Sequence, residues 1–267
     1  RIERFFDAFF GAAGNPWRHL GALGFHFLWI ALATGIYLFI VLDTGIEDVH
    51  TSIESYTHEQ WWLGGIMRSL HRYSADGLVL VMLLHLLREF LYGRFHSFHW
   101  YSWIWLVYAS GIGGYWLVWD QLGLFSAVAS AEWFDWLPIF STPATRNFLP
   151  GVLTDRFFSL LVFLHIGIPL TLMLALWVHI QRISQADVFP SRALALGTFV
   201  MLLVLAFVKP TVSHGKADLS VVPEVLHIDW YYLFIHPLMY LTSPAGLWAL
   251  VGLATLLLLA LPLLPHP

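Results

Sequence analysis

Long apolar blocks alternate with polar segments along the chain. A membrane-spanning helix needs about 20 mostly apolar residues, and six segments meet this requirement to within a few residues. These segments are residues 20–42, 73–92, 101–119, 157–180, 193–209 and 245–264. The pattern predicts an all-α, polytopic membrane protein with about six transmembrane helices.

Three of the connections between these spans are long: residues 43–70, 120–156 and 210–244. Residues 120–156 are too polar to span a bilayer, so we expect short surface helices there. Six spans put the three long connections on one face and both termini on the other. At the N-terminus, apolar residues fall on one helical face and charges on the other, so residues 1–19 are expected to lie on the membrane surface, in contact with lipid.

The charges of the loops give the orientation. The face with the termini carries seven arginines and four acidic residues, whereas the long connections carry six basic and thirteen acidic residues. Short loops rich in arginine stay on the cytoplasmic side of a membrane. We therefore expect cytoplasmic termini and a bacterial inner membrane location.

Composition supports a membrane protein and excludes several classes of site. Hydrophobic residues make up 58% of the chain and charged residues only 11%, whereas about a quarter of a soluble domain is charged. The net charge of −4, without a basic tail, gives no indication of a nucleic acid partner. Cysteine is absent, which excludes disulfides, Cys-ligated iron–sulfur clusters and thioether-linked haem within this chain. Histidine, a common metal ligand, is plentiful, with 14 copies.

Two of the predicted spans carry histidine pairs with identical spacing. His71 and His85 are 14 residues apart, as are His165 and His179. Fourteen residues make almost four helical turns, so each pair shares a helix face and is separated by ~21 Å along the axis. If these two helices, which we take to be antiparallel, face each other, they form two bis-imidazole sites, one above the other.

Such sites suit b-type haem. An electron-transferring haem iron takes two axial ligands, whereas zinc needs four ligands grouped closely. A single intramembrane histidine often just bonds a neighbouring helix, but the repeated spacing argues against that for four residues. The sequence predicts two b-type haems, each with bis-His ligation of its iron.

Nearby residues fit the same interpretation. Arg68 and Arg88 each lie three residues from a histidine and could pair with the anionic haem propionates, although an interfacial anchor is an equal alternative. Gly21, Gly35 and Gly114 lie in the first and third spans, where glycine lets a porphyrin edge approach the backbone. Helix packing through small residues would also explain these glycines.

Several stretches together resemble the cytochrome b family of the bc1 and b6f complexes, most closely the cytochrome b6 branch. They are "HLGALGFHFLWIALATG", "RSLHRYSA" with "HLLR", "GGYWLVWDQLG" and "HGKADLSVVPEVLHIDWYYLF". The resemblance implies a surface segment over residues 1–19 and a di-haem four-helix bundle over residues 20–185. It also implies a C-terminal two-helix region with a quinol-site loop over residues 186–267. The chain would thus combine regions that the b6 branch divides between two subunits.

The resemblance also implies a function. His71 and His165 match the ligands of the family's outer, low-potential haem, and His85 and His179 match those of its inner, high-potential haem. The family carries electrons across the bilayer between two quinone sites. It bifurcates the electrons of a quinol between this haem chain and a separate Rieske iron–sulfur protein. A c-type cytochrome or another redox subunit and a dimeric complex are implied as partners, and the chain would be the membrane subunit of a quinol oxidoreductase.

A quinol site is implied by residues 228–231, which resemble the family's Pro-Glu-Trp-Tyr signature. Asp229 stands in the place of the acid that takes a proton from the quinol, and Trp230 and Tyr231 match the last two positions. A loop acid that only caps a helix is the alternative for Asp229.

The chain departs from the family's pattern at several positions. Val118 and Ile228 stand where the family has prolines, and Trp100 stands at the spacing of an expected glycine. His19 stands where the b6 branch has the cysteine that anchors an extra haem. These departures leave open a di-haem membrane anchor, which would relay electrons between a peripheral dehydrogenase or hydrogenase and quinone without bifurcation. A non-catalytic scaffold or a transporter is a further alternative.

Overall fold

A computed structural model describes residues 2–97, 103–139, 141–149, 152–183 and 186–263, and these residues form an all-α fold without a β-strand. The described helices are α1 (Ile2–Gly14), α2 (Leu20–Val41), α3 (Val49–His58), α4 (Ile66–Leu91), α5 (Ile104–Val118), α6 (Gln121–Asp135), α7 (Asp155–Gln181), α8 (Arg192–Val208), α9 (Trp230–Leu233), α10 (Ile235–Leu241) and α11 (Pro244–Ala260). Trp100, the start of the predicted third span at residues 101–102 and the end of the sixth at residue 264 lie outside the described residues.

The six predicted spans correspond to α2, α4, α5, α7, α8 and α11, which confirms the predicted fold class. Among the described residues, three helical stretches are long and apolar enough to cross a membrane: Pro16–Val41, Asp155–Gln181 and Pro244–Leu263. α5 and α8 are apolar but shorter. α4 has 26 residues and begins before residue 73, where the predicted span starts. The prediction missed its first two turns because they carry the charged Arg68 and Arg72, which interrupt the apolar pattern.

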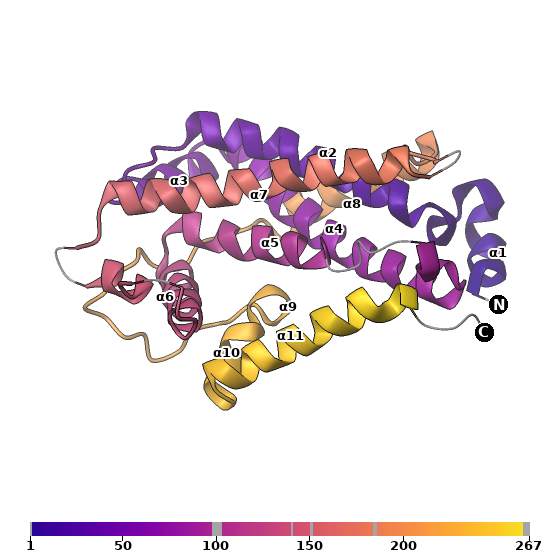
Figure 1. Cartoon of the computed structure of the whole chain (residues 1–267). Helices are drawn as coiled ribbons and strands as arrows, with labels where there is room; N and C mark the ends of the chain where they lie inside the picture. The colour runs from indigo at the N-terminus through magenta and orange to yellow at the C-terminus, as the bar shows by residue number, and fades with distance from the viewer. Residues whose placement is uncertain (1, 98–102, 140, 150–151, 184–185, 264–267) are drawn as a thin grey trace.

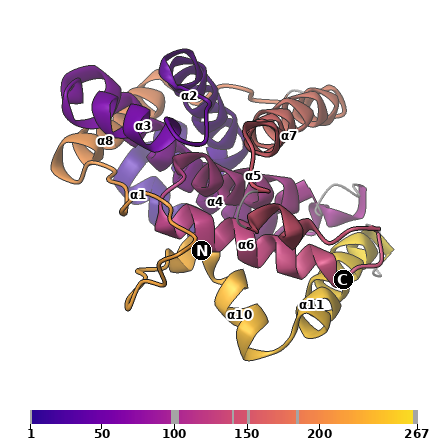
Figure 2. The same cartoon turned by 90° about the vertical axis from the view of Figure 1, so that its left-hand side faces the viewer.

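The helices are arranged as the connection lengths predict. Both termini lie at one end of the molecule, and α3, α6 and α10 lie at the other, here called the loop end (Figure 1). Seen from the loop end, α4 and α5 lie in the middle, with α2 and α8 against α4 and with α7 against α5 (Figure 2).

The relative direction of α4 and α7 differs from the expectation. Both helices begin at the loop end and run toward the termini (Figure 1), so they are parallel. The antiparallel expectation was wrong, because two helices separated by one intervening span cross the membrane in the same direction. In parallel helices the first histidine of α4, His71, faces the first histidine of α7, His165. In antiparallel helices it would instead face His179.

Side-chain caps define where the helices begin at the ends of the long connections. A Ser, Thr or Asp oxygen accepts a hydrogen bond from a backbone N–H in the first turn, which satisfies one of the donors that a helix start leaves unpaired. These caps are Asp120 on α6, Thr154 on α7, Ser191 on α8, Asp229 on α9 and Ser243 on α11. The sequence thus fixes the helix starts locally.

Burial is distributed as expected for a membrane bundle. α7 and α11 carry large exposed apolar side chains, among them Phe163 and Trp177 on α7 and Leu256 on α11, which are suited to lipid. Residues 120–156 form short helices as predicted, but α6 packs into the structure rather than lying on its surface. Its small residues, such as Ser126 and Ala129, are fully buried.

Asp120 joins the start of α6 to the long connection before α9. Its carboxylate accepts hydrogen bonds from the backbone N–H of Gly123, at 2.7 Å, and of His214, at 2.8 Å. The side chain is almost completely buried, so both bonds form away from water. Asp120 therefore orders the loop end that carries the candidate quinol-site loop.

We predict that Asp120→Ala destabilises the folded protein by about 1–3 kcal/mol, because it removes a helix cap and leaves buried N–H donors unpaired. Thermal unfolding in detergent, followed by circular dichroism, measures the change. Asp43→Ala is the matched control, since Asp43 is exposed and its carboxylate makes no hydrogen bond among the described residues. Equal unfolding temperatures for the two variants would contradict this role of Asp120.

Candidate functional site

The structure brings two of the four predicted histidines, His71 on α4 and His165 on α7, close together. The imidazole centroids of His71 and His165 are 6.1 Å apart, with the ring planes inclined at 72°. His85 and His179 each lie 14 residues further along the same two helices, α4 and α7, which run toward the end with the termini (Figure 1). The pairing follows from the shared 14-residue spacing on two parallel helices.

The flanking helices fix how the outer pair is oriented. The Nδ1 atom of His71 lies 2.8 Å from the carbonyl oxygen of Ala31 on α2, and that of His165 lies 3.0 Å from the carbonyl oxygen of Ser110 on α5. A carbonyl oxygen only accepts, so each Nδ1 carries the proton and each Nε2 is left with its lone pair. This is the arrangement of a metal-bound histidine, whose other nitrogen donates to a carbonyl or carboxylate.

The distance between the outer rings also fits a bound haem. Metal–imidazole bonds are about 2 Å long, so two rings on opposite sides of one iron have centroids roughly 6 Å apart. The observed 6.1 Å agrees with that value. The donor set and spacing of His71 and His165 therefore fit a bis-imidazole iron.

All three predicted glycines lie beside these histidines. A Cβ atom added at Gly35 would stand 3.0 Å from Cε1 of His71, and one at Gly114 would stand 3.3 Å from Cε1 of His165. At Gly21 the corresponding distance to Cε1 of His85 is 3.5 Å. The glycines thus make room for the imidazole rings, whereas the sequence had suggested room for the porphyrin edge.

Both predicted arginines are held by protein groups. Arg68 is buried and donates to Thr57 Oγ1 at 2.9 Å and to Ser213 Oγ at 2.7 Å. Arg88 donates to Glu89 Oε1 at 3.0 Å and lies over the Tyr92 ring. Their pairing with haem propionates stays a prediction.

Asp229 lies at the centre of a polar network at the loop end. One of its carboxylate oxygens caps α9 by accepting from the backbone N–H of Tyr231 at 2.8 Å. The other accepts from the Tyr115 hydroxyl at 2.5 Å and from the Arg72 guanidinium. The capping role weighed as an alternative is therefore present, and the same side chain also joins α9 to α4 and α5.

The network keeps the Asp229 carboxylate ionised. Burial alone would raise the pKa of Asp229, but the Tyr115 hydrogen bond and the Arg72 charge hold that pKa below its ordinary value. An aspartate with a lowered pKa stabilises the fold above its unfolded pKa, and this contribution is lost as the pH falls through the folded pKa. At neutral pH, the Asp229 carboxylate is therefore negatively charged and pairs with Arg72.

Trp230 and Tyr231, the two aromatic residues of the signature, lie in different environments. Trp230 is 78% exposed, so its ring lies at the surface of this chain. The Tyr231 hydroxyl donates to the backbone carbonyl of Asp76 on α4 at 3.1 Å. Tyr231 therefore belongs to the network around Asp229, whereas Trp230 does not.

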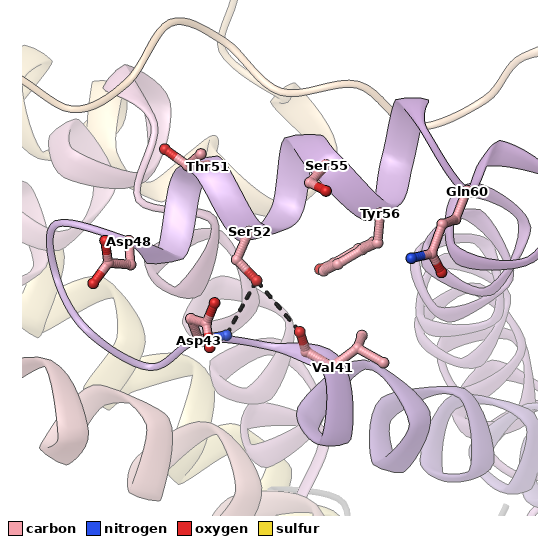
Figure 3. A pocket seen from close by; sticks show the side chains of 8 residues that line it. All are labelled: Val41, Asp43, Asp48, Thr51, Ser52, Ser55, Tyr56 and Gln60. Carbon is pink, nitrogen blue, oxygen red and sulfur yellow. Dashed lines mark hydrogen bonds between the residues drawn. The ribbon is translucent and has the colours of Figure 1, made fainter.

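A separate polar pocket of about 340 Å³ opens between the end of α2 and α3 (Figure 3). It is lined by Val41, Asp43, Asp48, Thr51, Ser52, Ser55, Tyr56 and Gln60. The Ser52 hydroxyl lies between the Val41 carbonyl oxygen and the Asp43 backbone nitrogen (Figure 3). None of the predicted site residues lines this pocket, so it is not part of the candidate site.

Sequence reasoning missed Arg72 and Tyr115, which hold Asp229. A signal was present for Arg72, because a charged residue within a membrane-spanning helix marks a functional site by default. For Tyr115, one aromatic residue in an aromatic-rich span gave no signal. The carbonyls of Ala31 and Ser110 were also missed, since their role is a backbone contact between helices.

The all-α bundle, with a histidine pair between two of its helices, has the architecture of a membrane cytochrome. A sequence profile of the cytochrome b/b6/petB family matches residues 9–187, and the chain belongs to this family. Membership implies b-type haem, electron transport and an integral membrane protein.

Individual proteins agree with this assignment. Cytochrome b6 of Porphyra purpurea is 28% identical over 180 residues, which are 63% of this chain and 82% of that protein. Cytochrome b6 of Auxenochlorella protothecoides is 27% identical over 179 residues, 63% and 81% of the two chains. A solved chain of a hyperthermophilic respiratory Complex III has a TM-score of 0.72 at 18% identity, covering 92% of this chain and 75% of that one. The last likeness shows a shared fold.

We predict that Gly35→Ala perturbs the outer histidine pair, because the new methyl group would stand only 3.0 Å from Cε1 of His71 and overpack the site. The haem content of the purified variant should fall. Gly21→Ala is the matched control, since its methyl group would meet His85 at an ordinary contact distance of 3.5 Å. Full haem content in both variants would contradict a tight fit at Gly35.

Proposed function

We propose that this chain is the di-haem cytochrome b subunit of a membrane quinol-oxidising complex of the bc1 or b6f type. The observation that carries the proposal is the outer pair. His71 and His165 stand at the spacing of two axial ligands, and each has its Nδ1 fixed by a backbone carbonyl. Structural histidines would not need both features together.

His71 with His165 and His85 with His179 would each hold one b-type haem. A haem with two imidazole ligands supplies reversible one-electron transfer when bound. Arg68 and Arg88 would pair with its propionates, and Gly21, Gly35 and Gly114 keep space beside the ligands. The ~21 Å along each helix between the two pairs sets the two sites at different depths in the membrane.

The chain divides into three regions in this proposal. Residues 1–19 lie on the membrane surface, residues 20–185 form the di-haem bundle, and residues 186–267 carry the quinol-site loop. Asp229 would accept a proton from quinol at the loop end, with Tyr115 and Arg72 keeping its carboxylate ionised and in place. Tyr231 positions the same loop against α4, and Trp230, exposed on this chain, would face the substrate or a partner subunit.

The proposed setting is a multi-subunit complex. Since this chain has no cysteine for an iron–sulfur cluster, a Rieske iron–sulfur protein and a c-type cytochrome or another redox subunit would accept electrons. We place the complex in a bacterial inner membrane, as a dimer, with the termini in the cytoplasm.

A second candidate is a di-haem anchor that exchanges electrons between a peripheral dehydrogenase or hydrogenase and the quinone pool without bifurcation. Val118, Ile228 and Asp229 favour it, because they differ from the family's pattern at the outer quinol site. Co-purification distinguishes the two, since a Rieske protein supports the first candidate and a molybdenum or nickel enzyme supports the second.

We predict that His85→Leu removes one haem and retains the other, because the outer ligands are on different turns of α4 and α7. The reduced-minus-oxidised optical spectrum of the purified variant measures the loss as a halved b-type signal per protein. Retention of both haems would refute His85 as a ligand.

We predict that Asp229→Asn slows quinol oxidation on the order of 100-fold, the usual size of a general base contribution, with both haems retained. The asparagine keeps the shape of the cap but cannot take a proton. Asp218→Asn, on the same connection and exposed, is the matched control. Unchanged turnover in the Asp229 variant would remove this residue from the proton path.

A further inference from the structure

His85 differs from the outer ligands, His71 and His165, in what surrounds its ring. The Nδ1 atom of His85 is buried and has no hydrogen-bond partner among the described residues. The outer ligands, His71 and His165, both have a backbone carbonyl at hydrogen-bond distance. His85 therefore lacks the backbone acceptor that orients those rings.

The carboxylate of Glu89 lies near His85 Nδ1 and can serve as its hydrogen-bond acceptor. Glu89 follows His85 by four residues, one turn along α4, and its Oε1 is 3.9 Å from His85 Nδ1. That is ion-pair range and about 1 Å beyond a hydrogen bond. Residues four apart on a helix share a face, so a change of the Glu89 side-chain rotamer can close the gap without moving the backbone.

The structure holds Glu89 in this place with two cations. Arg88 Nη1 donates to Glu89 Oε1 at 3.0 Å, and Arg94 Nε lies 3.0 Å from Glu89 Oε2. Arg88 also lies 3.6 Å from Glu3 of α1. The Glu89 side chain is only 20% exposed, so its charge is partly shielded from water and acts strongly on its neighbours.

We propose that Glu89 tunes the reduction potential of the inner haem site, as the anionic partner of His85. The proposal rests on the function proposed above, in which His85 holds a haem iron. Glu89 is a positioning and tuning residue that acts through His85.

The direction of the effect follows from charge. A carboxylate at the far nitrogen of an axial imidazole makes that ligand more basic, and a nearby negative charge favours the oxidised, more positive iron. Glu89 therefore lowers the potential of the inner site. It also balances Arg88 and Arg94, which without it would raise that potential.

Potentiometric titration of the purified, haem-loaded protein, followed optically, tests the proposal. In Glu89→Gln, the midpoint of the inner haem should rise and that of the outer haem should stay unchanged. We expect at least a tenfold change in the reduction equilibrium constant, about 59 mV for a one-electron couple. The titration wave that is missing in His85→Leu identifies the inner haem.

Asp7→Asn is the matched control, because Asp7 is a carboxylate near the same end of the molecule that pairs with Arg18 and not with a histidine. Its two midpoints should equal those of the unmodified protein. If Glu89→Gln does not retain two haems, Glu89→Asp carries the test, since its shorter side chain moves the charge away from Nδ1 and should give a smaller rise.

Two haems with unshifted midpoints in the Glu89 variants, or equal shifts of both haems, would overturn the role of Glu89 and leave the proposed function standing. Absence of haem from the unmodified protein would instead overturn the proposed function.

Discussion

A buried imidazole within a membrane-spanning helix is stabilised by a partner at each ring nitrogen, and this constraint determines how the helices pack around the outer histidine pair. Water is absent from the hydrocarbon layer, so the partners must come from neighbouring helices or from a bound group. For His71 and His165 the carbonyls of α2 and α5 satisfy Nδ1, which leaves Nε2 for a metal. The packing of α2 on α4 and of α5 on α7 is thus inseparable from the chemistry of the site.

At the loop end, two buried or half-buried carboxylates each make several hydrogen bonds that hold the elements together. Asp229 caps α9 and also binds Arg72 and Tyr115, so one side chain starts a helix and fixes it to two others. Asp120 does the same for α6 and the connection that follows α8. Because Asp229 is built into this framework, its carboxylate cannot move freely, and the proton transfer proposed for it would depend on the geometry of α4 and α5.

The sequence predicted those features that depend on periodicity or on local chemistry. The six spans, the side shared by the termini and the pairing of His71 with His165 all follow from apolar block length and a 14-residue spacing. The parallel direction of α4 and α7, the burial of α6 and the contacts of Arg68 and Arg72 were not predicted. They depend on which helices pack together, and an arginine in a span has the same local sequence pattern whether it meets a propionate, Ser213 or Asp229. The glycines illustrate the difference, since their positions were predicted but their contact with the imidazoles needed three dimensions.

The haem content of the purified, unmodified chain tests the central claim most directly. The number of b-type haems per chain, measured from the pyridine haemochrome spectrum and the protein concentration, should be two, and both should be reducible in a redox titration. Two haems would agree with one iron between His71 and His165 and another between His85 and His179. One haem or none per chain, after expression with excess haem, would contradict the account of two haem sites.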